Sequence, residues 1–310
     1  MQLKKKRFLK DDSAFALKQR SKSAKIVFAI VFVVFMLYAI TLVYPFVILF
    51  INSLKDGVEY LNDLNAQNIL KKPDKWLFGN YKDAFTSLRL IDSYGQEIGM
   101  FQMFINSLMF AGIASFAPAA CSTLTAYALS KFEFKLKPVL YTISIITLTI
   151  PIVSNTAPML SLTNEMGIYN TWAYVFLVNF GGFGFNFLVL NGFFKNISWS
   201  YAEAAMIDGA GQWRVFLSVM LPQAIPAIVS LVVMQFIASW NDYNTILLFM
   251  PDFPTLSAGL YRVELNITRL ENGYPVFFAG ILISVLPILV LFITFFDTIM
   301  KNVSVGGLKG

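Results

Sequence analysis

Histidine is absent from this chain of 310 residues, and cysteine occurs once, at Cys121. Without histidine there is no His-ligated metal site, no Ser-His-Asp triad and no imidazole acid-base chemistry. A single cysteine excludes an intramolecular disulfide, and Cys121 lies in an apolar run where a small side chain packs well. The commonest routes to enzymatic activity are therefore not expected.

Charged residues are also scarce, at 14% of the chain, whereas hydrophobic residues make up 57%. This balance is typical of membrane proteins, because about a quarter of the residues of a soluble domain are charged. A bilayer-spanning helix needs about 20 mostly apolar residues. The segments that meet this requirement predict an all-α, polytopic membrane protein with six transmembrane helices, at residues 26–51, 101–129, 139–162, 171–194, 223–249 and 274–300.

The first apolar run is predicted to be a retained span. It is longer than the core of about 7 to 15 residues of a cleaved signal, and it has no small-x-small site at its end. We divide the chain into a basic N-terminal segment, the first span with a long outer loop, a five-span core and a tail, which comprise residues 1–25, 26–100, 101–300 and 301–310.

Lysine and arginine predict which side of the membrane each loop faces. If the N-terminus is inside, the inner segments hold 16 of the 24 basic residues and the outer segments hold 8. Cytoplasmic flanks collect basic residues, so we expect both termini to be cytoplasmic, with the chain in the cell membrane. The basic N-terminal segment is typical of an orientation signal that contacts anionic lipid, rather than of a nucleic-acid-binding arm.

This orientation makes residues 195–222 the longest cytoplasmic loop, which contains the stretch EAAMIDGAGQWRVFLSVMLP from Glu203 to Pro222. Good helix formers begin the stretch, and Gly209 and Gly211 adopt left-handed backbone torsions at little cost. We predict a short helix, a glycine turn and a second helix that leads into the next span.

This loop has few means of catalysis. Glu203 and Asp208 are five residues apart and lie on different faces of a helix, so they make a poor acid-base pair. The small side chains of Ala204 and Ala205 permit close approach by a partner. From residue chemistry alone, two interpretations of the loop are about equally supported: a docking surface, and an amphipathic connector on the membrane surface.

The stretch resembles the cytoplasmic loop of ATP-binding cassette importer permeases. Their pattern is E-A-A, three residues, G, nine residues, a β-branched apolar residue, one residue, then L-P, and AAMIDGA is similar to the sugar-importer version. Every position of the pattern is filled, by Glu203, Ala204, Ala205, Gly209, Val219, Leu221 and Pro222. The resemblance implies a coupling helix near residues 203–211, including Asp208 and Gly211, that sits in a cleft of an ATPase subunit.

The resemblance extends over most of the chain. FGNYKDAF at residues 78–85, INSLMFA from Ile105, LTAYALSKFEFK from Leu124 and SWNDYN from Ser239 are similar to segments of carbohydrate permeases. The final GGLKG resembles the tail of the six-span maltose-type subunit. In that family the tail reaches the ATPase dimer interface, which implies ATPase contacts by Gly306, Gly307 and Lys309. The implied fold is that of a type I importer permease.

Two segments depart from the family pattern. Residues 87–102 of the long outer loop have no recognised counterpart, and GGFGFNF at residues 181–187 replaces an expected Pro-Phe pair. The glycines and Asn186 could open or polarise a transport pathway. Close helix packing is the favoured alternative.

The chain is not expected to work alone, because it has no G-x-x-x-x-G-K-[ST] phosphate loop. The resemblance implies that ATP and Mg²⁺ are held by a separate cytoplasmic ATPase dimer and that this chain needs no cofactor. It also implies a second homologous permease subunit and an extracytoplasmic substrate-binding protein, which the family contacts through the loop at residues 251–273. We also expect the chain to contact membrane lipids and not to bind nucleic acid.

Polar residues within the spans are candidates for the substrate pathway, because they usually face a bundle interior or water. Sugars suit hydrogen-bonding groups beside aromatic faces. The candidates are Trp240, Asn241, Tyr243 and Asn244, with Asn155 and Asn186 as weaker ones. Asp242 is more typical of a helix cap.

The sequence therefore predicts a permease subunit that imports a carbohydrate, an oligosaccharide by preference. A permease for another solute such as a peptide, an ion-coupled transporter and a membrane enzyme are the rival hypotheses.

Overall fold

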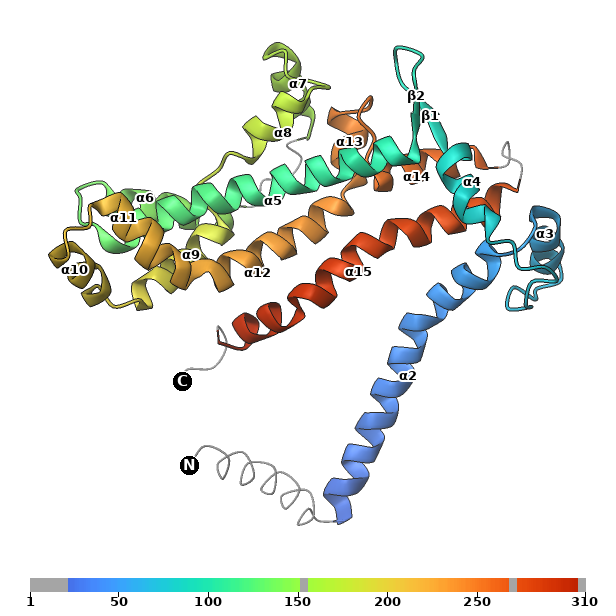
Figure 1. The fold of residues 1–310 in the computed structure, drawn as a ribbon, viewed down its shortest axis with the longest axis horizontal. Coiled ribbons are helices and arrows are strands. Elements are labelled where there is room, and N and C mark those ends of the chain that lie inside the picture. Colours follow the sequence, from blue (N-terminus) through green and yellow to red (C-terminus); the bar gives the residue numbers. More distant parts are fainter. Residues whose placement is uncertain (1–21, 151–155, 268–271, 306–310) are drawn as a thin grey trace.

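The computed structural model describes residues 22–150, 156–267 and 272–305, and most of these residues are helical. Three long helices, α5 (Met100–Lys131), α12 (Leu221–Trp240) and α15 (Gly273–Val305), run along the length of the molecule (Figure 1). The fourth long helix is α2 (Lys22–Ser53). The C-terminal end of α2 lies near α15, and the N-terminal end of α2 lies away from the other three helices (Figure 1).

Shorter elements connect the long helices. They are α3 (Gly57–Asn65), α4 (Gly79–Ser87), β1 (Arg89–Ile91), β2 (Glu97–Gly99), α6 (Lys137–Thr149), α7 (Thr156–Glu165), α8 (Trp172–Asn179), α9 (Phe185–Asn196), α10 (Ser200–Ile207), α11 (Gln212–Val215), the π-helical turn η1 (Phe216–Met220), α13 (Tyr243–Phe249) and α14 (Leu256–Glu264).

Four helical segments among the described residues are long and apolar enough to cross a membrane, namely Ala24–Ser53, Met100–Lys131, Gln212–Trp240 and Gly273–Asp297. They correspond to the first, second, fifth and sixth predicted spans. The third and fourth predicted spans are instead each divided between two shorter helices, α6 with α7 and α8 with α9. That these two divided segments cross the membrane stays a prediction.

Helix α5 is the central packing element, in contact with α8, α9, α12 and α14. Its buried positions include a series of small side chains, at Ala111, Ala114, Ser115, Ala119, Ser122 and Ala126. Small residues let helix backbones approach closely, which is how helices associate where water supplies no driving force. The sequence of α5 therefore determines how tightly its neighbours pack.

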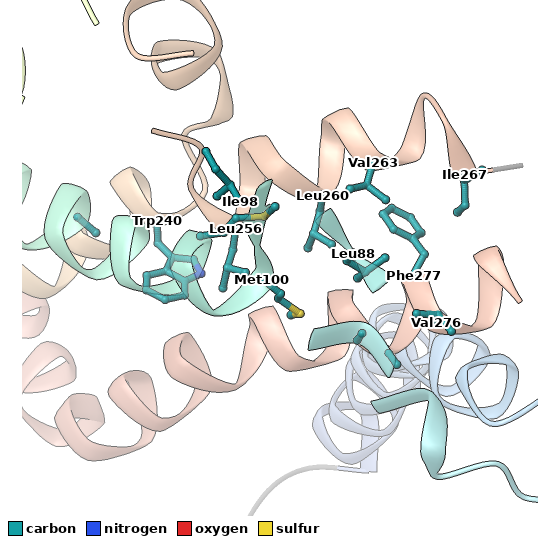
Figure 2. Packing of buried hydrophobic residues seen from close by; sticks show 14 residues of the cluster. Leu88, Ile98, Met100, Trp240, Leu256, Leu260, Val263, Ile267, Val276 and Phe277 are labelled. Carbon is teal, nitrogen blue, oxygen red and sulfur yellow. The ribbon is translucent and has the colours of Figure 1, made fainter. Parts of the chain in front are cut away.

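A cluster of buried side chains joins the ends of the long helices to the connecting segments. Leu88 and Met100 lie against Leu260 and Phe277, and the Trp240 side chain lies beside Leu256 (Figure 2). These residues come from α5, α12, α14, α15 and the segment after α4. Apolar contacts thus hold these ends of the helices together.

The loop that follows α2 is folded around a buried ion pair. The Lys55 ammonium is fully buried and donates to Asp63 over 2.8 Å, and Lys71 lies 3.6 Å from the other carboxylate oxygen. Asn80 donates to the carbonyls of Ser53 and Lys55, both at 2.8 Å. The hydrogen bond from Lys55 holds the pKa of Asp63 below its ordinary value.

Strands β1 and β2 form an antiparallel hairpin with Arg89 opposite Gly99. The hairpin lies within the segment without a recognised counterpart, and the all-α expectation is wrong there. Its turn is fastened by Asp252, whose carboxylate accepts from the Ser93 amide at 2.8 Å, from the Ser93 hydroxyl, and from the Asn170 side chain at 2.6 Å. Three segments that are distant in the sequence thus meet at one carboxylate.

Asp63→Ala is expected to destabilise the protein by about 3 kcal/mol, because it leaves the Lys55 ammonium buried without its carboxylate partner. Thermal unfolding of the detergent-purified protein measures this change. Asp74→Ala, which removes an exposed carboxylate from the same loop, is the control and should change little. The double variant Lys55→Met/Asp63→Leu should recover most of the loss; an equally unstable double variant would contradict the role given to the unpaired charge.

Asp252→Ala is expected to lower the free energy of opening the hairpin by about 2 kcal/mol, because hydrogen bonds to a carboxylate are lost. Burial acts to raise the pKa of Asp252, but hydrogen bonds from Ser93 and Asn170 and the nearby Arg262 bring it below its ordinary value.

A lowered folded-state pKa means that the contribution is present above the unfolded pKa of about 4 and is lost as the pH falls through the folded pKa. Hydrogen exchange of residues 89–99, corrected for intrinsic rates, should therefore be constant from about pH 5 to 8 in the wild type. Asp83→Ala, at an exposed position of α4, should leave this exchange unaltered. Fast hydrogen exchange of residues 89–99 in the wild type at neutral pH would contradict the stabilisation of the hairpin by Asp252.

Candidate functional site

Helix α10 is a short helix closed by a glycine turn, as the sequence predicts. Asp208 caps it, the Gly209 amide donates to Met206 at 3.0 Å, and the Ala210 amide donates to Ala205 at 2.9 Å. This pair of bonds is the Schellman arrangement, which requires a left-handed residue after the cap. Gly209 has φ +83°, so a residue without a Cβ suits this position.

Gly211 has a different role in the same turn. Its φ of −71° and ψ of 163° are ordinary extended values, and it caps the start of α11 without a side-chain hydrogen bond. The two glycines therefore differ in what they tolerate. A Cβ at either position meets no atom within 4 Å, so backbone torsion alone distinguishes them.

One face of α10 is anchored and the other is open. Ala202 is fully buried in a cluster with Phe194, Phe216 and Met220, which belong to α9 and η1. The side chains of Glu203 and Ala204 are exposed, and Ile207 is 85% exposed. No ion pair within the described ranges involves Glu203 or Asp208.

Ala205 is partly buried, whereas Trp213, which follows the turn, is 70% exposed. The helix thus presents small residues together with large apolar ones to its surroundings. An anchored helix with an exposed apolar side is suited to enter a groove of another protein. It offers no paired acid and base.

The loop joins α12 without a break. Helix α11, the π-turn η1 and α12 form one helical segment from Gln212 to Trp240, and Leu221 and Pro222 begin α12. Pro222 lies where η1 meets α12, and because proline has no N–H it donates no hydrogen bond to the preceding turn. The loop that holds α10 therefore leads directly into a long apolar helix.

The opposite end of α12 holds the predicted SWNDYN residues. The Trp240 side chain is buried, and its indole N–H donates to the Ser284 carbonyl at 3.2 Å. The Asn241 amide donates to Ile237 at 2.8 Å. The Asp242 carboxylate accepts from the Thr245 amide at 3.0 Å and caps α13, which confirms its predicted capping role.

The remaining pathway candidates differ in their surroundings. Tyr243 and Asn244 are exposed, and the Tyr243 ring stacks on Tyr261 with ring centroids 5.0 Å apart. Asn186 lies in the first turn of α9 and is partly buried. Asn155 lies outside the described residues, as do Gly306, Gly307 and Lys309 of the tail.

Sequence reasoning missed how residues 251–273 are organised. This predicted loop contains helix α14, whose Leu256, Leu260 and Val263 side chains are buried. The hydrophobic spacing within α14 was the available signal. The described residues contain no group of three or more His, Cys, Asp or Glu that could hold a metal ion.

The long apolar helices define a multi-pass membrane protein, in which α10 is anchored on one face and exposed on the other. Residues 119–304 match the model of the family described as binding-protein-dependent transport system inner membrane component. This match covers more than half of the chain, which therefore belongs to that family. As a member, it is a membrane component of a transport system and not an enzyme.

Individual relatives are similar over nearly the whole chain. The diacetylchitobiose uptake system permease protein NgcG of Streptomyces coelicolor is 27% identical over 273 residues, which cover 87% of this chain and 85% of that protein. The galactooligosaccharides transport system permease protein GanQ of Bacillus subtilis is 26% identical over 289 residues, which cover 92% and 96%.

A solved structure has the same fold. It is that of a bacterial ABC transporter involved in the import of the acidic polysaccharide alginate, and one of its chains superposes with a TM-score of 0.73 at 21% identity. The superposition covers 90% of this chain and 98% of the other. The helices described above thus have the arrangement of an importer's membrane subunit.

Proposed function

We propose that this chain is the permease subunit of an ATP-driven, binding-protein-dependent importer of carbohydrate, with oligosaccharides as the preferred solutes. The observation that carries the proposal is the exposed, one-sided anchoring of α10 at the start of a continuous helix into the membrane. Relatives named for diacetylchitobiose and galactooligosaccharide support the solute class.

The proposed topology has six crossings with both termini in the cytoplasm. The divided segments α6 with α7 and α8 with α9 supply the third and fourth crossings. The excess of lysine and arginine on the inner side supports this orientation. It puts α10 in the cytoplasm and the hairpin with α13 and α14 on the outer side of the cell membrane.

The proposed partners follow from which surfaces are open. The exposed side of α10, with Glu203, Ala204 and Ile207, suits a cleft of a cytoplasmic ATPase dimer that holds ATP and Mg²⁺. The tail with Gly306, Gly307 and Lys309 supplies a second contact with that dimer. The apolar side chains of α2 are exposed along most of its length, which suits membrane lipid and a second homologous permease subunit.

An extracytoplasmic binding protein delivers the solute to the outer segments. ATP binding favours the closed ATPase dimer, and only such differential affinity can shift the equilibrium between inward-open and outward-open states. Closure displaces α10, and the continuous segment Gln212–Trp240 carries that displacement to the outer end of α12. There Asn241, Tyr243 and Asn244 contact the solute; Trp240 supports them through its buried packing.

The proposal is tested by comparing substitutions of Gly209 and Gly211, the two glycines of the turn after α10, in the reconstituted complex. Gly209→Val is strained because a β-branched residue at φ +83° costs about 1 to 2 kcal/mol. Binding-protein-stimulated ATP hydrolysis and solute uptake should both fall about tenfold in this variant.

Gly211→Val is the matched control, because it adds the same side chain two residues away at extended torsions that valine favours. It should retain wild-type coupling. Equal activity of the two variants would contradict the role of the turn. Uptake that continues in the absence of any ATPase subunit would overturn the proposed function itself.

A further inference from the structure

The break between α8 and α9 lies deep within the proposed membrane span. Residues 180–184 are not helical, and Lys195, the next basic residue, lies ten residues after Phe185. Ten helical residues span about 15 Å, which is half of a hydrocarbon core of about 30 Å. The Thr125 hydroxyl of α5 donates to the Gly182 carbonyl at 2.6 Å and holds the break against the bundle.

Glycine makes this break possible at two positions. Gly184 has φ +113°, which side-chain-bearing residues rarely adopt. A Cβ on Gly182 would lie 2.7 Å from the Thr125 methyl group, so any other residue there would have to displace the Thr125 side chain of α5. Gly181 is different, because its φ is ordinary and a Cβ would meet no atom within 4 Å. One side of the break is therefore packed and the other is open.

Several polar groups of the break have no partner within the described part of the chain. The amides of Gly182 and Phe183 make no hydrogen bond there, and neither does the side chain of Asn186. The Gly184 amide has only a long bond of 3.4 Å to the Ser144 hydroxyl. Non-helical backbone at membrane depth is tolerated where protein buries it or where it lines a water-filled cavity.

The open side favours water-filled surroundings over burial in protein. Gly181 and Phe183 are exposed while Gly182 is partly buried against α5, so one side of the break is accessible. We propose that residues 180–186 form a backbone-lined contact for polyhydroxylated solutes in the wall of the transport pathway. The inference rests on the proposed function and adds a segment to the pathway described at the outer end of α12.

The chemistry of the break suits such a solute. Sugar hydroxyls both donate and accept, so they can satisfy free backbone amides and carbonyls together with the Asn186 amide. The exposed Phe183 ring offers an apolar face beside them. Backbone contacts recognise hydroxyl groups without selecting one sugar, as expected where a solute must pass and not be retained.

Water access is tested by cysteine labelling of the assembled complex in lipid nanodiscs. With Cys121 replaced by alanine, single cysteines are introduced as Gly181→Cys and Phe183→Cys and are treated with a charged methanethiosulfonate reagent. Val33→Cys, in the middle of the apolar α2, is the dry control. Both test positions should react about tenfold or more faster than the control, because only a wet wall admits a charged reagent.

Solute contact is tested by repeating the labelling with the binding protein loaded with diacetylchitobiose or galactooligosaccharide, whichever it captures. The reaction at Gly181→Cys should then slow at least about twofold during ATP turnover, since solute would occupy the contact. If both test positions react no faster than Val33→Cys, the proposal that residues 180–186 face water is wrong. If solute leaves the labelling rate at Gly181→Cys unchanged, the proposed solute contact is wrong.

These outcomes are separable from the proposed function. Stimulation of ATP hydrolysis by the loaded binding protein is measured on the same samples. If stimulation is present and Gly181→Cys is unreactive, the inference is wrong and the proposed function stands. If no carbohydrate stimulates hydrolysis while labelling is fast, the carbohydrate assignment is wrong.

Discussion

The close approach of helices to α5 is the constraint on which the remaining structure depends. Ala111, Ala114, Ala119 and Ala126 are buried along this helix, and α12 and α9 lie directly against it. In a bilayer the apolar effect does not drive helix association, so van der Waals contact between small residues must do so. A larger side chain at any of these positions separates the neighbours and widens the bundle along its length.

That packing links the two ends of the molecule. Helix α12 lies on α5, is joined through η1 to the loop that holds α10, and ends at Trp240, whose side chain packs in a cluster with Leu256 (Figure 2). The π-turn at Phe216–Met220 lies between the loop and α12. Extra-residue turns of this kind occur often at functional sites. A helix that is fixed along its side and joined at its start to an exposed loop is well placed to transmit motion.

Some of this arrangement was readable from the sequence. Long apolar runs predicted the four continuous helices, and Gly209 after a run of helix formers predicted the turn that closes α10, because both signals are local. The divided fourth span was not predicted, since Phe180 and Phe183 keep the glycine segment apolar. The hydrogen bonds between Ser93 and Asp252 could not be predicted, because Ser93 lies 159 residues away in the chain.

The central claim is that α10 enters an ATPase subunit, and proximity tests it directly. A single cysteine placed as Ile207→Cys, in a chain with Cys121 replaced by alanine, is treated with a short thiol crosslinker beside an ATPase subunit carrying single cysteines along its surface cleft. The account predicts crosslinks confined to the cleft, with yields that differ between ATP-bound and nucleotide-free complexes. An Ile207→Cys variant that crosslinks to no ATPase position, in a complex that remains assembled, would contradict it.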